Sequence, residues 1–176
     1  MNENRANFKN WYVDILAGLY PNREAGFVIL LVTFPLLERY LREKSGIHEQ
    51  LNLDPRFYQK LLDLFPELET IDEPPKFWEA YRHGLLHQVT IGHKRRKSGV
   101  SHDLESTLKT DSSGKFWLHP VKFAKRVIQQ IEDDFSTFEG GDSGNPPLPR
   151  IYSHGGSGFS GTATSGPEMP SFLVED

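Results

Sequence analysis

The strongest constraint on the fold of this 176-residue chain is the spacing of its apolar residues, which recur every three to four positions in several segments. This spacing gathers apolar side chains on one side of a helix, and that side must be buried against another element. In the clearest segment, between residues 25 and 44, six residues form the apolar side: Phe27, Leu30, Leu31, Phe34, Leu37 and Leu41. The solvent side of the same segment consists of Glu38, Arg39, Arg42, Glu43 and Lys44. The chain is therefore predicted to fold as a packed helical domain.

Start and stop signals divide this pattern into five predicted helices. The first contains Phe8, Trp11, Tyr12, Ile15 and Leu16 and ends near residue 18, and the second ends at residues 45–46, a serine followed by a glycine. An aspartate shortly before a proline, at residues 54–55 and again at 72–75, opens the third and fourth helices. The fourth is expected to reach residue 88, and a histidine and a proline at residues 119–120 open the last, whose apolar residues recur from Val121 to Phe138.

The helical spacing disappears between residues 89 and 118, where two short segments predict a β-hairpin. Residues 104–108 and 115–118 are separated by Asp111-Ser112-Ser113-Gly114, which is a typical turn sequence. The expected fold class is therefore all-α, a bundle of about five helices over residues 4–139 with a small hairpin before the last helix.

Residues 140–176 differ sharply from the rest of the chain. Eight of the fifteen glycines lie between Gly140 and Gly166, together with prolines and serines. Such a segment buries too little apolar surface to offset the entropy lost on ordering, so a disordered tail is expected. Its last residues, 169–176, combine apolar and acidic side chains, which is compatible with a short docking peptide for an unidentified protein partner.

Composition excludes several classes of protein. The absence of cysteine excludes disulfides, thiolate metal sites and cysteine nucleophiles. The longest apolar run, Ala25 to Leu37, is shorter than the roughly 20 residues that a membrane-spanning helix needs. The polar opening residues do not resemble a secretory signal. We therefore expect a cytoplasmic protein with no membrane partner.

Charge is distributed unevenly along the chain, whose net charge is −4. Residues 82–126 contain ten Lys and Arg against three Asp and Glu, and five of the seven histidines. The flanking segments, 1–81 and 127–176, are both acidic. A basic segment in an acidic protein is typical of a local phosphate-binding surface, although it also balances the charge of its acidic neighbours.

The basic segment begins with the most informative motif, Arg82-His83-Gly84-Leu85-Leu86-His87. This sequence, late in the fourth predicted helix, resembles the signature of HEPN domains. In that family an arginine, often followed by Asn, Asp or His, precedes a histidine four to six residues later. Many members are metal-independent RNA-cutting enzymes, and others are their inactive relatives. Val89 stands where toxin members regulated through a tyrosine carry that residue, so such regulation is not implied.

The resemblance implies an RNA endonuclease or RNA-binding domain of the kind that acts in defence or stress response. Arg82 and His87 would be the catalytic residues and His83 would support them, with RNA as partner and a homodimer building a composite site. Histidine can move protons near neutral pH, and arginine can stabilise a charged phosphorane, so neither metal nor cofactor is required. Positions five apart on an α-helix are about 140° apart. Arg82 and His87 can therefore reach one phosphate only because the arginine side chain is long, or if two chains each contribute to the site.

Two other interpretations of this helix remain open. In the first, the protein is a non-catalytic interaction or scaffold domain, in which Arg82 pairs with Glu79 or Asp72 and His87 is a satisfied structural histidine. In the second, Glu79, His83 and His87, which share one helix face at spacings of four, bind zinc with a further ligand such as His119. Nothing resembling a complete metalloenzyme motif accompanies them, so a site without metal is favoured.

The segment that follows the motif is strongly basic and contains His93, Lys94, Arg95, Arg96 and Lys97. A cationic loop beside a phosphate-cleaving site would add affinity for RNA through counterion release, so these five residues are the predicted RNA-binding residues. Phe116 and Trp117 are suited to base stacking, but a role in the core of the hairpin is favoured.

Overall fold

The computed structural model describes residues 3–47, 54–88 and 98–139, except for the side chains of His83, Leu86, His87 and Gln88. These residues are mostly helical and include one small sheet. The helical segments are, in chain order, α1 (Glu3–Phe8), η1 (Lys9–Val13), α2 (Asp14–Leu19), η2 (Arg23–Ala25), α3 (Gly26–Ser45), α4 (Pro55–Leu64), η3 (Pro66–Leu68), α5 (Glu73–Trp78), η4 (Glu79–Gln88), α6 (Pro120–Asp133) and η5 (Phe135–Phe138).

Several of these segments join end to end, so the five predicted helices are confirmed. α1, η1 and α2 form the first, and α5 and η4 form the fourth. Segments η1 and η4 are π-helical, with hydrogen bonds between residues five apart, whereas η2, η3 and η5 are short 3₁₀ turns.

The predicted start and stop signals act at most helix ends. Gly46, with φ of 65°, ends α3 in the left-handed conformation that glycine adopts without strain. The Asp54 carboxylate accepts a hydrogen bond of 2.8 Å from the backbone N–H of Arg56 at the start of α4. Asp72 precedes α5 as predicted, but its side chain makes no capping hydrogen bond within the described chain.

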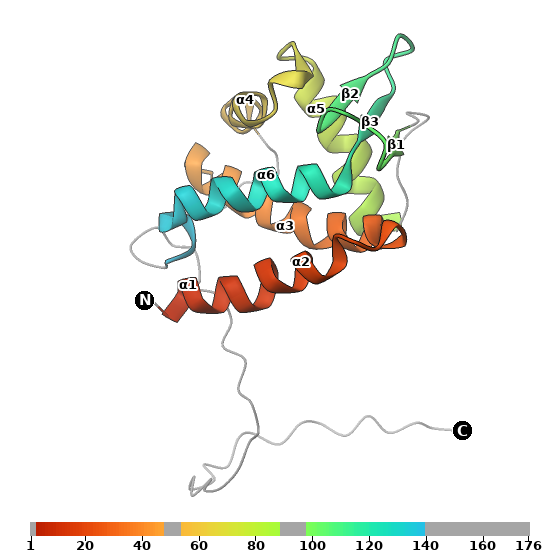
Figure 1. Ribbon diagram of the computed structural model, residues 1–176. Helices are drawn as coiled ribbons and strands as arrows, with labels where there is room; N and C mark the ends of the chain where they lie inside the picture. The colour runs from red at the N-terminus through yellow and green to blue at the C-terminus, as the bar shows by residue number, and fades with distance from the viewer. Residues whose placement is uncertain (1–2, 48–53, 89–97, 140–176) are drawn as a thin grey trace, which may run out of the picture.

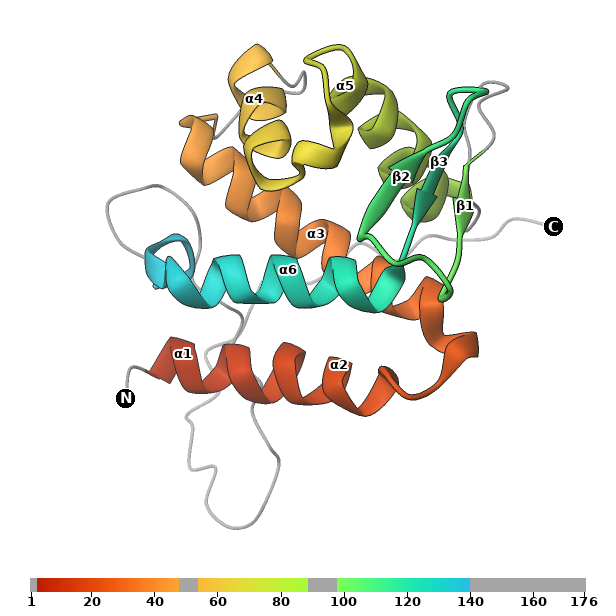
Figure 2. The ribbon, with the colours of Figure 1, turned by 45° about the horizontal axis from the view of Figure 1, so that its top comes forward.

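Helix α6 lies centrally, with the N-terminal rod of α1, η1 and α2 on one side and helices α4 and α5 on the other (Figure 1 and Figure 2). Helix α3 packs extensively against α6 and also contacts α4 and η4. The two ends of the described region meet, because the Asn4 side-chain amide donates a 2.6 Å hydrogen bond to the carbonyl of Glu139.

The core is rich in aromatic side chains and centres on Phe34 of α3, which is fully buried. Its ring centroid lies 4.9 Å from that of Phe123 in α6, 5.7 Å from that of Trp78 and 6.1 Å from that of Tyr81. These rings come from α3, α6 and the α5–η4 helix, so one cluster joins three helices that are distant in sequence. Each ring is buried, and offset or edge contacts between rings add to the free energy of burial.

The sheet has the strand order β1-β3-β2 and consists of β1 (Gly99–Val100), β2 (Leu108–Thr110) and β3 (Phe116–Leu118). Strands β2 and β3 pair antiparallel, with Leu108 opposite Leu118, so a hairpin is present as predicted, but its first strand is Leu108–Thr110 and not residues 104–108. β1 was not predicted and pairs parallel with β3. A Cβ atom at Gly99 would lie about 2.5 Å from the Trp117 ring, so only glycine fits beneath that ring.

Three details of the sequence prediction were wrong. Ile15 and Phe27, both assigned to buried stripes, are 55% and 41% exposed. Leu16 and Leu30, from the same two stripes, are fully buried as predicted, and α3 also buries Ile29, which was not assigned to the stripe, because packing selects only part of a broad apolar face. The last helix was also expected to continue to Phe138, but it ends at Asp133, and a 3₁₀ turn carries Phe138 into the core.

The predicted disordered tail, residues 140–176, lies outside the described residues. The buried apolar residues from Phe8 to Phe138 form one cluster. The predicted bounds of the domain, residues 4–139, stay a prediction. Every helix in the described ranges is too short or too polar to cross a lipid bilayer.

Candidate functional site

Residues 82 and 87 both lie in η4, and its π-helical backbone changes their relation. On an α-helix they would face about 140° apart. In a π-helix each N–H bonds to the carbonyl five residues earlier, so residues five apart stand about one turn apart on nearly the same face. The π-helical backbone therefore reduces the angular separation that the sequence argument assumed for positions 82 and 87.

The side chain of Arg82 extends to helix α3, where it forms an ion pair with Glu38. Its Nε donates a hydrogen bond of 2.9 Å to Glu38 Oε2, and its Nη2 lies 3.5 Å from Oε1. The side chains are partly buried, with 24% of Arg82 and 14% of Glu38 exposed. The sequence had suggested Glu79 or Asp72 as partners of Arg82. Glu38 lies on a different helix, 44 positions away from Arg82 in the sequence.

A second arginine contacts the same carboxylate from within α3. Nε of Arg42 donates a hydrogen bond of 3.0 Å to Glu38 Oε1, in the i,i+4 arrangement that favours ion pairs on helices. Two guanidinium groups from different helices therefore meet at one carboxylate. We refer to Glu38, Arg42 and Arg82 as the arginine cluster.

The backbone that carries Arg82 is held firmly by its neighbours. Tyr81 is fully buried, and its hydroxyl lies 2.7 Å from the carbonyl of Gly99 and 3.0 Å from that of Phe116. Burial raises the pKa of the Tyr81 hydroxyl, which keeps it protonated as a hydrogen-bond donor. Leu85 and Gly84 are also buried. The arginine cluster thus stands directly beside the packed core.

The structure brings only part of the predicted site into view. The backbone of His83 and His87 lies in η4, but their side chains are outside the described part of the molecule. The predicted RNA-binding residues, His93, Lys94, Arg95, Arg96 and Lys97, lie outside it as well. Their predicted roles therefore stay predictions.

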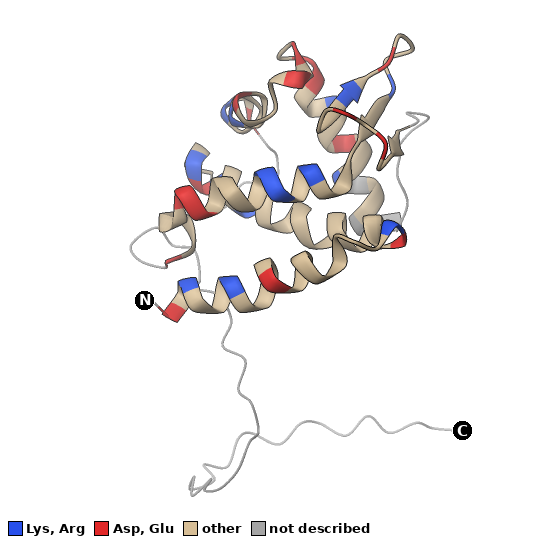
Figure 3. Cartoon of the chain, viewed as in Figure 1, with Lys and Arg blue, Asp and Glu red and all other residues tan. Residues whose placement is uncertain are grey.

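The remaining described basic residues of segment 82–126 include several along α6 (Figure 3). Lys122 Nζ donates to the carbonyls of Leu104 and Glu105, and Arg126 pairs with Glu67 at 2.7 Å. Trp117 also has an internal role, since its Nε1–H donates to Asp111 at 3.1 Å, and Phe116 is buried. These contacts stabilise the fold.

The zinc interpretation is only partly tested. Among the described side chains, no group of three or more His, Asp or Glu is placed to hold a metal ion. His119 begins α6, where its Nδ1 accepts a hydrogen bond of 3.3 Å from the backbone N–H of Lys122. Burial and the nearby Lys122 charge lower the pKa of His119, so this acceptor is present at neutral pH.

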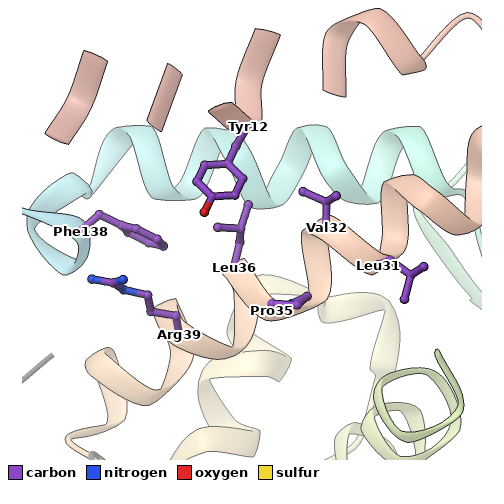
Figure 4. Close-up of a pocket in the computed structure, with 7 residues that line it drawn as sticks. All are labelled: Tyr12, Leu31, Val32, Pro35, Leu36, Arg39 and Phe138. Carbon is purple, nitrogen blue, oxygen red and sulfur yellow. The ribbon is translucent and has the colours of Figure 1, made fainter. Parts of the chain in front are cut away.

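An apolar cavity of about 360 Å³ lies between η1, α3 and η5 (Figure 4). Its walls are formed by Tyr12, Leu31, Val32, Pro35, Leu36, Arg39 and Phe138. The Arg39 guanidinium lies 4.6 Å from the centre of the Phe138 ring, and burial lowers the pKa of Arg39. The cavity shares no lining residue with the arginine cluster, and none of the described residues that line it carries a carboxylate.

Sequence reasoning missed Glu38 and Arg42 as members of a site, since both were assigned to the solvent side of the second helix. Their i,i+4 spacing signals an ion pair, but nothing local indicates that Arg82 joins it. Comparison of the chain with protein-family models, curated proteins and solved structures finds no match.

Proposed function

We propose that this domain is a HEPN-like bundle that cleaves RNA without a metal ion, with Arg82 and His87 as catalytic residues and His83 in support. The observation that carries the proposal is the π-helical backbone of η4, which places positions 82 and 87 about one turn apart. The contact between Arg82 and Glu38 supports it, because a held guanidinium needs little reorganisation to stabilise developing charge.

The proposed reaction needs only groups that the chain and the RNA supply. The His87 imidazole removes the proton from a ribose 2′-hydroxyl, whose oxygen attacks the adjacent phosphorus while the bond to the 5′-oxygen breaks. The Arg82 guanidinium stabilises the charged phosphorane, and a second histidine, from His83 or another copy of the chain, protonates the leaving oxygen. The products are a 2′,3′-cyclic phosphate and a 5′-hydroxyl.

The experiment incubates purified protein with single-stranded RNA in excess chelator. Cleavage should leave 2′,3′-cyclic phosphate ends and should spare RNA that is methylated at the 2′-oxygen. Arg82→Ala and His87→Ala should each reduce the rate by about 10²- to 10⁴-fold while the circular dichroism spectrum is retained. Cleavage that stops in chelator and returns with zinc would instead favour Glu79, His83 and His87 as metal ligands.

A non-catalytic interaction domain is the second candidate, and one observation favours it. The ion pair between Arg82 and Glu38 links α3 to η4 and has the partial burial of a structural contact. An intact wild-type protein that cuts none of a diverse set of RNAs would favour this role.

A further inference from the structure

The apolar cavity between η1, α3 and η5 continues into an apolar face of α3 that is in contact with water in the described part of the chain. Leu31 and Val32, which line the cavity, are only partly buried, and Pro35 is exposed. Phe27 and Val28 stand one turn before Leu31 and Val32, so they lie on the same side of the helix, and they are 41% and 48% exposed. An exposed apolar patch of this kind is typical of a surface that binds a partner.

The N-terminal rod adds apolar side chains on the other side of the cavity. Tyr12 projects from the rod toward α3 (Figure 4), and Ile15, three positions later on the same side of the rod, is 55% exposed. The volume of about 360 Å³ lies within the range of roughly 300–1,000 Å³ that is usual for binding pockets. The cavity and its margins can therefore accept more than one apolar side chain.

The chain leaves the described region directly beside this cavity. Phe138 lines the cavity, and Glu139 is the last described residue of the domain. At about 3.3 Å per residue, residues 140–168 can span up to roughly 95 Å. Residues further along the chain can therefore reach the cavity without any change in the fold, and the covalent link raises their local concentration there.

One part of the chain beyond Glu139 has the chemistry that the cavity requires. Phe172, Leu173 and Val174 form the longest uninterrupted run of hydrophobic residues between positions 140 and 176. Large aliphatic and aromatic side chains are those whose transfer from water to an apolar site is most favourable. A run of three such residues also matches a binding surface whose walls are mainly aliphatic and aromatic.

We propose that the cavity is a docking site for residues 169–176 of the same chain, and that the side chains of Phe172, Leu173 and Val174 occupy it. Leu31, Val32 and Pro35 form the wall on α3, and Tyr12 forms the wall on the rod. The inference does not depend on the proposed function, because it involves no residue of the arginine cluster and no RNA.

The test measures the proximity of the two segments in the full-length protein. The chain contains no cysteine, so Ser171→Cys provides a single site for a nitroxide spin label beside the apolar run. In ¹⁵N-labelled protein, the oxidised nitroxide should broaden the backbone amide signals of Tyr12, Leu31 and Val32, and reduction of the label should restore them. Signals of β2, which lies on the other side of α6 from the rod (Figure 1), should keep their intensity. Equal broadening at both places, or none at the cavity, would overturn the proposal.

Two triple variants of the labelled chain test whether the apolar run causes the proximity. The first is Phe172→Ser, Leu173→Ser, Val174→Ser, and the matched control is Leu148→Ser, Ile151→Ser, Tyr152→Ser. Both remove three hydrophobic side chains from the chain beyond Glu139. The first should abolish the broadening at the cavity and the control should leave it intact. Loss in the control alone, or equal effects in the two variants, would contradict the assignment of residues 172–174.

A substitution in the cavity tests the other half of the contact. Val32→Asn places a polar side chain in the wall and should reduce the broadening. Ile71→Asn is its control, since Ile71 is 48% exposed and does not line the cavity, and this change should have no effect. If Val32→Asn lowers the thermal midpoint, the triple variant at residues 172–174 decides, because those residues lie outside the described core.

A mixing experiment separates docking within one chain from docking between two copies. Spin-labelled chains without ¹⁵N are mixed with ¹⁵N-labelled chains that have no spin label. Unbroadened cavity signals in this mixture, with broadening in the doubly labelled chain, support docking within the chain. Equally strong broadening in the mixture would show that the segment of one copy binds the cavity of another, and it would overturn the proposal.

Discussion

Helix α3 contacts the α5–η4 helix through two regions of opposite chemistry. Around Phe34, aromatic rings from three helices are buried together. One turn further along α3, Glu38 receives Arg42 and Arg82 in a partly buried ionic contact. The first region is stabilised because apolar surface is removed from water. In the second region, the attraction between the charged groups is offset in part by the cost of removing them from water. Residues that stabilise the core and residues of the candidate site therefore lie one turn apart on the same helix, but hydrophobic burial governs the first and electrostatics the second.

The largest effect is expected from Phe34→Ala, which should lower the free energy of unfolding by about 3–5 kcal/mol by leaving a cavity among the rings. Urea unfolding followed by circular dichroism measures it. Phe27→Ala is the control on the same helix, and because Phe27 is exposed it should cost less than about 1 kcal/mol. Similar losses in the two variants would contradict the claim that the buried rings around Phe34 stabilise the fold.

The ionic region should contribute less. Arg82→Met removes the charged hydrogen bonds to Glu38 and should cost about 1–3 kcal/mol in the same urea assay. Adding Glu38→Gln should cost less than the sum of the single changes, because each single change already removes the charged interaction between the two side chains, which the double variant loses only once. Strictly additive losses would mean that the observed ion pair contributes nothing to stability.

Tyr81 makes both apolar and polar contacts, since its ring packs in the core and its hydroxyl bonds to backbone carbonyls of the sheet. Tyr81→Phe keeps the ring but leaves the carbonyls of Gly99 and Phe116 without this donor. The expected loss is about 1 kcal/mol. Hydrogen exchange should accelerate at the backbone N–H of Ser101, which bonds to Leu118 in β3. Unchanged exchange there would show that the hydroxyl does not hold the sheet.

The smallest effect should be a pH dependence from His119. Burial and the Lys122 charge lower its folded-state pKa below the ordinary value of 6.5, so the unfolded chain takes up the proton first. The contribution of His119 to stability is therefore complete above the unfolded-state pKa and is lost as the pH falls through the folded-state pKa. Protonation also removes the Nδ1 acceptor that caps α6.

His119→Ser provides the comparison for this pH dependence, because serine caps helices but does not titrate. The thermal midpoint of His119→Ser should rise relative to that of the wild type as the pH falls below about 6.5. A difference that stays constant between pH 5 and pH 7.5 would contradict the prediction.

Much of the secondary structure was predictable because its causes are local. Asp54 before Pro55 and Gly46 after Ser45 mark helix ends through hydrogen bonds and backbone conformations within a few residues. The β2–β3 hairpin was predictable for the same reason, because its turn residues are adjacent in the chain. β1 escaped prediction because two residues carry too little pattern and their partner strand lies beyond β2.

The candidate site was predictable only in part. The motif from Arg82 to His87 stands out in the sequence, but its geometry was assumed to be α-helical, whereas η4 is π-helical. Glu38 and Arg42 resembled ordinary solvated charges, because the partner that distinguishes them is 44 positions away from Glu38.

The sequence by itself determined which segments are helical, where most of them begin and end, and which residue types are available for chemistry, since these follow from local hydrogen bonding and apolar periodicity. Only the tertiary structure decided which part of each apolar face is buried, as the exposure of Ile15 and Phe27 shows. It also decided that Arg82 meets Glu38 and Arg42. Locally, the alternative helix faces and charged residues are equivalent, and the packing of helices that are distant in sequence decides which of them make contact. The local sequence therefore does not predict that outcome.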